Sequence, residues 1–242
     1  MAVIDLIMQR MKNRSKGYFV LIDPEKRSVD LNRMVQNINR TYVDAILVGG
    51  SNKNISGFHS FIVRLKKMTD VPIVLFPGSH SQISKEADAI LLLSLLNSRS
   101  LKHVIGEHID AAETIVRSGI EVIPTAYIVM DKTGKTSVSR AAEVLKLKSE
   151  DDVKKYIYAS SLMSYSVVYL EAGSGASQSI SPSAVKIARR ILDKPIIVGG
   201  GIKTPDKAKS LLKAGADIIV TGNAIEKNPD LILDFGALVK RF

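Results

Sequence analysis

Eight short apolar runs recur along the chain, and each is followed by a turn. The runs are nearly continuous in apolar residues, which is typical of strands buried on both faces of a parallel sheet. They cover residues 18–23, 43–48, 72–77, 87–93, 121–128, 166–171, 195–200 and 217–222. Eight strands connected in this way predict the α/β class and a (β/α)8 TIM barrel, with residues 1–242 forming a single domain.

The segments between the runs carry apolar residues at helical spacing, and Ser181-Pro182 and Thr204-Pro205 are typical helix starts. A further amphipathic segment at 3–13 is expected to cover the bottom of the barrel. The expected helices cover residues 28–40, 56–68, 100–118, 139–163, 182–192, 204–214 and 229–240. Only the residues from Gly78 to Ala87 separate the third and fourth runs. We therefore predict that the third helix is reduced or missing, which leaves a gap in the outer ring.

Composition limits the chemistry that the chain can carry. The sequence has no cysteine, which excludes disulfides, thiolate metal sites and cysteine nucleophiles. Its four histidines, His59, His80, His103 and His108, are interpreted as surface or helix-packing residues. No apolar stretch approaches the roughly 18 residues of a membrane span, and Asp5 interrupts the start where a signal peptide would be uninterrupted. We expect a cytoplasmic protein.

The formal net charge is +10. Such a charge suits nucleic acid, an anionic membrane surface or a polyanionic small substrate, and a solvated basic surface explains most of it without any partner. The basic residues are dispersed, no RNA-binding motif is present, and aromatic residues make up only 5% of the chain. We therefore expect no nucleic-acid partner.

Small residues dominate the carboxyl ends of the predicted strands, where the active sites of such barrels lie. The last two strands lead into G-G-G-I-K-T-P and T-G-N-A-I, so that Gly200, Gly201, Gly222 and Asn223 fall in the two loops that commonly bind phosphate. The alternative is that these glycines serve only tight turns. Two such loops at the correct strands favour a phosphate monoester.

Asp23 and Ser51 end the first two strands and would lie side by side, across the barrel mouth from the phosphate loops. A carboxylate and a hydroxyl make too poor a set for a transition metal. They suit Mg²⁺, which keeps water ligands and takes others from a diphosphate. A helix-capping role is the alternative for Asp23, because Asp-Pro often opens a helix.

The stretch Y-L-E-A-G-S-G-A places Glu171 directly before a turn of small residues. Small residues let backbone N–H groups approach an anion, whereas a carboxylate repels it unless the two address different parts of one ligand. Glu171 could accept a proton from, or orient, a substrate hydroxyl. The alternative is a structural role in which Glu171 bonds to loop amides.

Taken together, seven motifs resemble the geranylgeranylglyceryl phosphate synthase family, relatives of the bacterial heptaprenylglyceryl phosphate synthases. The resemblance extends from Leu21 to Ile225, and its most specific part is Y-L-E-A-G-S-G in register with D-P and G-G-S. The motifs, in chain order, are L-I-D-P-E-K, V-G-G-S, P-G-S, Y-I-V-M-D-K-T-G-K-T-S-V, Y-L-E-A-G-S-G-A, V-G-G-G-I-K-T-P and T-G-N-A-I.

The resemblance implies a Mg²⁺-dependent prenyltransferase that joins an isoprenyl diphosphate to the 3-hydroxyl of sn-glycerol 1-phosphate, on a barrel without a normal third helix. It implies Mg²⁺ at Asp23 and Ser51 and makes Glu171 the base. It also implies a homo-oligomer. Transient contact with a membrane surface is a separate expectation, which the positive net charge suits. The glycerol phosphate residues that it implies are Tyr169, Leu170, Glu171, Ala172, Gly173, Ser174, Gly175, Gly200, Gly201, Gly222 and Asn223.

The residue two positions before the aspartate is Leu21, whereas some of the heptaprenyl relatives have a lysine there. This difference favours the geranylgeranyl branch and leaves Lys26 as a candidate cation for the anions. Two rival functions stay open. One is a phosphate-binding barrel isomerase or synthase of amino-acid biosynthesis, and the other is a non-catalytic basic protein that binds a ligand or a membrane surface.

Overall fold

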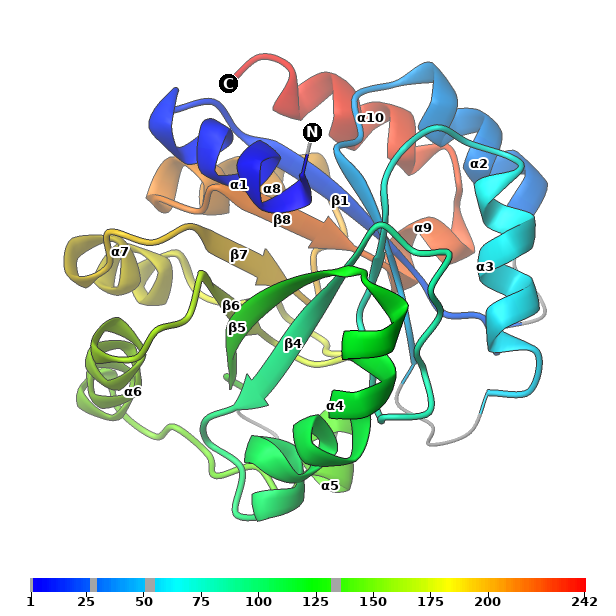
Figure 1. Cartoon of the computed structure of the whole chain (residues 1–242). Helices are drawn as coiled ribbons and strands as arrows, with labels where there is room; N and C mark the ends of the chain where they lie inside the picture. Colours follow the sequence, from blue (N-terminus) through cyan, green and yellow to red (C-terminus); the bar gives the residue numbers. More distant parts are fainter. Residues whose placement is uncertain (1, 27–29, 51–54, 132–135) are drawn as a thin grey trace.

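Eight parallel strands close into a barrel in sequence order, as the TIM barrel prediction required (Figure 1). The structure is a computed structural model, and it describes residues 2–26, 30–50, 55–131 and 136–242. The strands are β1 (Gly17–Ile22), β2 (Ala45–Val48), β3 (Ile73–Leu75), β4 (Ala89–Leu95), β5 (Glu121–Val129), β6 (Val167–Glu171), β7 (Ile196–Gly199) and β8 (Ile218–Thr221). β8 pairs with β1 in parallel, from Gly17 opposite Ile218 to Val20 opposite Thr221, and this pairing closes the sheet.

The strands separate two apolar cores, because successive side chains point to opposite faces of a sheet. Phe19, Leu91 and Tyr169 belong to the core inside the barrel. Tyr18, Ile90 and Leu170 belong to the core between the sheet and the helices. Burial on both faces explains why the strand sequences are almost continuously apolar.

Helices surround the barrel on most of its circumference (Figure 1). Side-chain caps begin several of them, including Asp30 before α2, Ser181 before α7 and Thr204 before α8. The helices are α1 (Val3–Lys12), α2 (Leu31–Arg40), α3 (Phe58–Lys66), the π-helical turn η1 (Lys102–Gly106), α4 (Glu107–Ser118), α5 (Ser137–Ala141), α6 (Glu150–Leu162), α7 (Pro182–Ile191), α8 (Pro205–Ala214), α9 (Asn223–Lys227) and α10 (Leu231–Val239).

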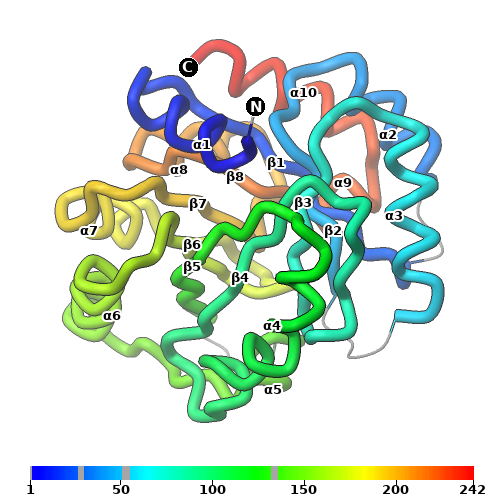
Figure 2. Tube along the Cα trace, in the orientation of Figure 1, coloured from blue at the N-terminus to red at the C-terminus, as the bar shows by residue number. Residues whose placement is uncertain are grey.

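The connection between β3 and β4 contains no helix, which confirms the prediction of a missing third helix. All residues from 76 to 88 are described, and they form turns and extended chain (Figure 2). The neighbouring helices α3 and α4 therefore flank a part of the sheet that lacks its usual helical cover.

The expected helix over 139–163 is wrong in one respect, because the segment divides into α5 and α6. Glu143 has a φ of 48°, a left-handed conformation that a continuing helix cannot contain. Asn97 then binds the separated chain, since its backbone and side chain both bond to Leu145. A capping box of Ser149 and Asp152 starts α6 anew. That S-E-D-D signal was present in the sequence and marks the true start of the second helix.

Helix α1 covers the bottom of the barrel, as expected. The N–H groups of Val3 and Ile4 donate to the Glu121 carboxylate at the start of β5, at 2.6 and 2.8 Å. Farther along the helix, Arg10 forms a 2.7 Å ion pair with Asp44, which precedes β2. The amino ends of the strands are thus closed by the protein itself.

No helix in the described part of the chain is both long and apolar enough to cross a bilayer.

Candidate active site at the carboxyl ends of the strands

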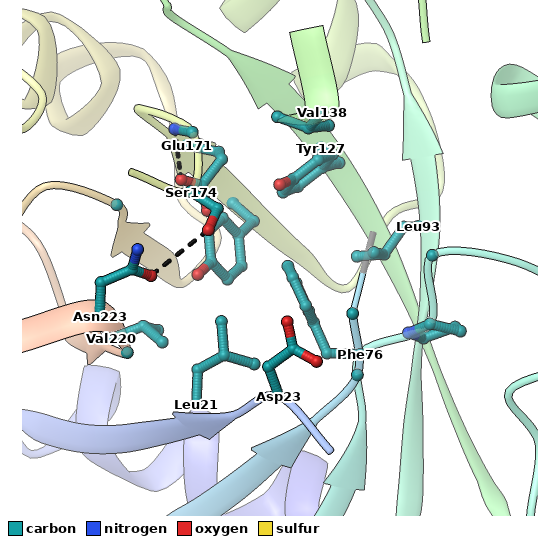
Figure 3. A pocket seen from close by; sticks show the side chains of 18 of the residues that line it. Leu21, Asp23, Phe76, Leu93, Tyr127, Val138, Glu171, Ser174, Val220 and Asn223 are labelled. Carbon is teal, nitrogen blue, oxygen red and sulfur yellow. Dashed lines mark hydrogen bonds between the residues drawn. The ribbon is translucent and has the colours of Figure 1, made fainter. Parts of the chain in front are cut away.

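A cavity of about 530 Å³ opens at the carboxyl ends of the strands. It begins inside the barrel mouth, where Glu171 and Asp23 lie on opposite sides (Figure 3). Ten of the predicted site residues line it together: Asp23, Tyr169, Glu171, Gly173, Ser174, Gly175, Gly200, Gly201, Gly222 and Asn223. The βα connections that the sequence pattern placed at one end of the barrel therefore do meet around one space.

Two of the predicted substrate residues do not line the cavity. Leu170 and Ala172 alternate with Tyr169 and Glu171, and their side chains point outward into the core under the helices. The motif Y-L-E-A thus presents every second side chain to the cavity, and a contact with a ligand from Leu170 or Ala172 is limited to the backbone.

Glu171 is a buried carboxyl group at the end of β6, only 5% exposed. Burial raises its pKa from 4.5 to about 7, because the charged form loses hydration. The N–H of Gly173 donates to Oε1 at 2.5 Å and offsets part of that rise, as do the phenols of Tyr169 and Tyr127. One loop amide therefore bonds to Glu171, as the structural alternative required. The elevated pKa nevertheless places this group where a general base works near neutral pH.

The two tyrosines beside Glu171 are also fully buried, and their rings lie 5.3 Å apart between centroids. Burial and the nearby Glu171 charge raise the pKa of both phenols well above 10, so both stay protonated as donors. The Tyr169 hydroxyl has no partner with hydrogen-bond geometry among the described residues. A buried hydroxyl without a partner costs free energy unless a ligand completes it. Tyr169 therefore adds a donor to the cavity beside Glu171.

Glycines leave the room that these side chains occupy. A Cβ at Gly199 would overlap the Tyr169 hydroxyl, and a Cβ at Gly200 would overlap Glu171 Oε1. Gly200 also has a φ of 77°, which side-chain-bearing residues rarely adopt. The glycines after β7 are thus required by the residues at the end of β6, in addition to any part in phosphate binding.

The loops after β6 and β8 meet on one side of the cavity. Ser174 Oγ donates to Asn223 Oδ1 at 3.3 Å, and Asn223 begins α9 directly after Gly222 (Figure 3). Helix α9 has only five residues, yet its first turn and the loop around Gly201 both face the cavity. The loops after β7 and β8, which form the phosphate site of many such barrels, thus border the same side of the cavity.

Asp23 lies next to Leu21 and Phe76, across the cavity from these loops (Figure 3). Its Oδ1 accepts the N–H of Glu25 at 3.1 Å, whereas Asp30 caps α2, so Asp23 does not cap the following helix. Ser51, the predicted second metal ligand, lies outside the described residues. At Gly50, just before it, an added Cβ would come within 2.7 Å of Asp23 Oδ1, so the chain that leads to Ser51 passes close to the carboxylate. An open carboxylate of this kind fits a hard divalent cation that keeps several water ligands.

Lys26, the candidate cation, also borders the cavity. Its Nζ lies 2.5 Å from Glu226 Oε2 and 3.4 Å from Asn223 Oδ1. The ion pair connects the loop after β1 with α9, so the charge of Lys26 is already shared with an acid.

The cavity continues out of the barrel over the top of β4. Leu93 and Leu95 line its inner part, and the outward-facing residues Ile90 and Leu92 line its outer part, together with Ala111 and Ile115 of α4. This outer part lies where a third helix would normally pack. The missing helix therefore leaves an apolar groove that is continuous with the barrel mouth. Sequence reasoning placed the gap but did not identify these residues, since helix-packing and groove-lining positions have the same apolar pattern.

All four histidines bond to neighbouring groups, as expected for surface and helix-packing residues. His59 meets Ser84 Oγ at 2.9 Å, and His80 meets Glu107 at 2.8 Å. His103 and His108 contact backbone carbonyls, although both also border the cavity. That position on the cavity wall was not predicted.

Comparisons with known proteins place the chain in a family. The model of the PcrB family matches residues 8–239. The chain is 37% identical to the geranylgeranylglyceryl phosphate synthase of Spirosoma linguale over 94% of this chain and 92% of that protein. It is 39% identical to the enzyme of the same name from Thermococcus kodakarensis, over 93% of this chain and 90% of that protein.

Solved structures agree with the sequence comparison. The crystal structure of (S)-3-O-geranylgeranylglyceryl phosphate synthase from Thermoplasma acidophilum, in complex with its substrate sn-glycerol-1-phosphate, matches with a TM-score of 0.92. The identity is 35%, and each chain is covered completely. The N-acetylmannosamine-6-phosphate 2-epimerase of Clostridium perfringens matches with a TM-score of 0.61 at 16% identity, which shows the fold alone. The protein described here is a member of the PcrB family.

Proposed function

We propose that this protein transfers a prenyl group, most readily geranylgeranyl, from its diphosphate to the 3-hydroxyl of sn-glycerol 1-phosphate and releases diphosphate. The family, the names of its relatives and the substrate complex of the Thermoplasma acidophilum enzyme support the reaction. One observation on this chain carries the proposal. Glu171, with a pKa raised to about 7 by burial, lies at the cavity between an anion-binding loop and the opposite carboxylate Asp23.

The acceptor fits the side of the cavity formed by the loops after β6, β7 and β8. Backbone N–H groups around Gly201 and Gly222 bind the phosphate of glycerol 1-phosphate. Glu171 and the unpartnered Tyr169 hydroxyl address the hydroxyl end of the same molecule. This division resolves why an acid precedes an anion-binding turn, because the acid and the amides bind different parts of one ligand.

Proton transfer then follows from the position of Glu171. A glycerol hydroxyl is a weak nucleophile, and removal of its proton by the Glu171 carboxylate increases its reactivity as the new C–O bond forms. Tyr127 and Tyr169 keep their protons beside the carboxylate and favour its charged form. The orientation of the bound hydroxyl toward the donor carbon contributes a further large part of the rate.

The donor diphosphate fits the opposite side, near Asp23 and Lys26. Asp23, together with Ser51, would hold Mg²⁺. When bound, this ion would neutralise negative charge on the departing diphosphate. Lys26 adds a cation at the same edge, although it shares its charge with Glu226. The prenyl chain occupies the apolar groove over β4, between the β3–β4 connection and α4.

The isomerase or synthase alternative is not favoured, because the epimerase matches in fold alone. A homo-oligomer, transient membrane contact and a cytoplasmic location stay predictions. Exposed apolar side chains on the outer helices, such as Leu101, Ile109 and Val116 near or on α4 and Leu162 on α6, are consistent with contact to another surface.

An extraction assay tests the proposal. Purified protein is incubated with Mg²⁺, labelled sn-glycerol 1-phosphate and farnesyl, geranylgeranyl or heptaprenyl diphosphate, and label in the organic phase is counted. We expect most label with the geranylgeranyl donor and none with labelled sn-glycerol 3-phosphate. A heptaprenyl optimum keeps the reaction and changes the branch. Folded protein that yields no extractable label with any donor overturns the proposed function.

A further inference from the structure

The motif Y-I-V-M-D-K-T-G-K-T-S-V, residues 127–138, has no assigned task beyond Tyr127. Its described residues place three polar side chains together: Asp131, Thr136 and Ser139, which follows the motif directly. Each is only 6% exposed. A carboxylate and two hydroxyls are seldom buried in this way unless they bond to one another.

The three side chains form a continuous hydrogen-bonded chain. Thr136 Oγ1 donates to Ser139 Oγ at 2.9 Å, and Ser139 Oγ donates to Asp131 Oδ2 at 2.8 Å. The same Oδ2 accepts the backbone N–H of Thr136 at 3.0 Å. Asp131 thereby fixes both the backbone and, through Ser139, the side chain of Thr136.

Thr136 in turn lies against the loop that follows Glu171, at Gly173. A Cβ at Gly173 would overlap the Thr136 side chain, so the threonine occupies the space that a non-glycine residue would fill there. Gly173, with a φ of 99°, is the residue whose N–H donates to Glu171. Close packing transmits a displacement of Thr136 directly to that amide.

The neighbouring backbone joins the same two loops a second time. The N–H of Met130 donates to the Glu171 carbonyl at 2.7 Å, directly before Asp131. Helix α5, which Thr136 caps, brings Val138 to the cavity above Tyr127 (Figure 3). An ordinary helix cap needs none of these contacts, since the Ser149 and Asp152 cap of α6 is exposed to solvent.

We propose that Asp131, Thr136 and Ser139 are positioning residues that hold the start of α5 against Gly173 and so keep Glu171 aligned with the loop from Gly173 to Gly175. This inference rests on the proposed function. None of the three residues lines the cavity, so they act through the Gly173 N–H and the shape of the loop from Gly173 to Gly175.

Asp131→Ala and Asp131→Asn test the proposal in the transfer assay, with each substrate varied in turn. We expect Asp131→Ala to raise KM for glycerol 1-phosphate about tenfold and to leave KM for the prenyl diphosphate within about twofold. The pKa that governs the pH dependence of kcat should rise, because the Gly173 N–H lowers the pKa of Glu171 and the variant displaces that N–H. The other groups that face Glu171, Tyr127 and Tyr169, are unchanged in the variant. Asp131→Asn retains an acceptor oxygen and should recover most of the loss.

Asp152→Ala is the matched control, because Asp152 also accepts backbone N–H groups at a helix start but lies away from the cavity. It should change neither KM nor the kinetic pKa. If Asp131→Ala does not fold, Ser139→Ala removes the middle group of the same hydrogen-bond network. The same changes in KM and in kinetic pKa are then expected of Ser139→Ala. Equal effects on both KM values, or a lower melting temperature with unchanged KM and pH profile, would overturn the proposal.

Hydrogen exchange separates this inference from the proposed function. Exchange of the backbone amides in 171–176 should be faster in Asp131→Ala than in the wild type, with exchange at the start of β5 unchanged. This result is independent of turnover. If the wild-type protein transfers no prenyl group, the proposed function is wrong, but exchange still tests the positioning role. If exchange and kinetics are both unchanged in Asp131→Ala, the positioning role alone is wrong.

Discussion

The two ends of the barrel use buried carboxylates in opposite ways. At the amino ends of three strands, an acid is paired with both a cation and a backbone amide. Asp44 accepts the N–H of Tyr18 and an ion pair from Arg10, and Asp217 accepts the N–H of Ile196 and an ion pair from Arg189. Asp88, whose side chain is 35% exposed, has the same kinds of partner in the N–H of Ile73 and in Lys66. Each acid directly precedes its own strand and bonds to the first part of the preceding one.

At the carboxyl ends, Glu171 is just as buried, but none of the cations among the described residues lowers its pKa. Neutral groups, namely the backbone N–H groups of Gly173 and Ala172 and the two phenols, favour its charged form. The difference teaches that burial alone does not mark a functional acid. At the amino ends a cation and an amide hold each of these acids, whereas Glu171 keeps a raised proton affinity that chemistry can use.

The largest expected effect that sharpens this comparison comes from Glu171→Gln. The substitution keeps the shape and the acceptor for Gly173 but removes the base, so kcat should fall by about 10²- to 10⁴-fold. Glu121→Gln is the matched change at the other end, where the carboxylate accepts the N–H groups of α1. It should lower the melting temperature and leave kcat unchanged. Full prenyl transfer by Glu171→Gln would show that the base is another group.

The second prediction concerns stability and pH. The folded-state pKa of Glu171, about 7, is above its ordinary value of 4.5, so the folded protein binds a proton more tightly than the unfolded chain. Its contribution to stability is fully present below about pH 4.5 and is lost as pH rises through 7. This difference corresponds to about 3 kcal/mol. Glu171→Gln should therefore be more stable than wild type at about pH 8, by several degrees in melting temperature, and similar at about pH 5. Parallel stability curves across that range would contradict the raised pKa.

Third, Gly200→Ala should disable the site through one methyl group. The Cβ would overlap Glu171 Oε1 and displace the base, so we expect kcat/KM to fall about 100-fold. Gly119→Ala provides the control, since Gly119 has a similar φ of 67° and no atom within 4 Å of an added Cβ. Its effect should be limited to a loss of about 1 kcal/mol of stability. Equal activity losses in the two variants would refute a specific role for the space at Gly200.

The smallest expected effect concerns the metal. Asp23→Asn removes one negative charge from the predicted Mg²⁺ site, so about tenfold more Mg²⁺ should be needed for half-maximal transfer. The melting temperature should change little, because the described contact of Asp23 is a local bond from the Glu25 N–H. An unchanged Mg²⁺ response would place the metal elsewhere.

The sequence predicted the barrel because its eight strands are buried on both faces and therefore stand out as apolar runs. It predicted the missing helix because Gly78 to Ala87 is too short to hold one. It also placed Asp23, Glu171 and the glycine loops at one mouth, since parallel strands bring their carboxyl ends together.

Other features depended on contacts between distant segments, which no local pattern contains. Glu143 and Asn97 divide the expected helix over 139–163 through a left-handed residue and bonds across 48 positions. Leu170 was assigned to the substrate, although strand alternation turns its side chain outward. The outer groove at Ile90 and Leu92 could not be separated from ordinary helix-packing positions by hydrophobicity.

The most direct test of the central claim is the titration of Glu171 itself. Protein labelled with ¹³C at the glutamate side-chain carboxyl carbon is compared with Glu171→Gln, so that the missing resonance identifies Glu171. The account predicts that this resonance titrates with a midpoint near 7, far from the ordinary 4.5. A midpoint near 4.5 would contradict it, because Glu171 would then be ionised like a surface acid and the two ends of the barrel would not differ in the way described.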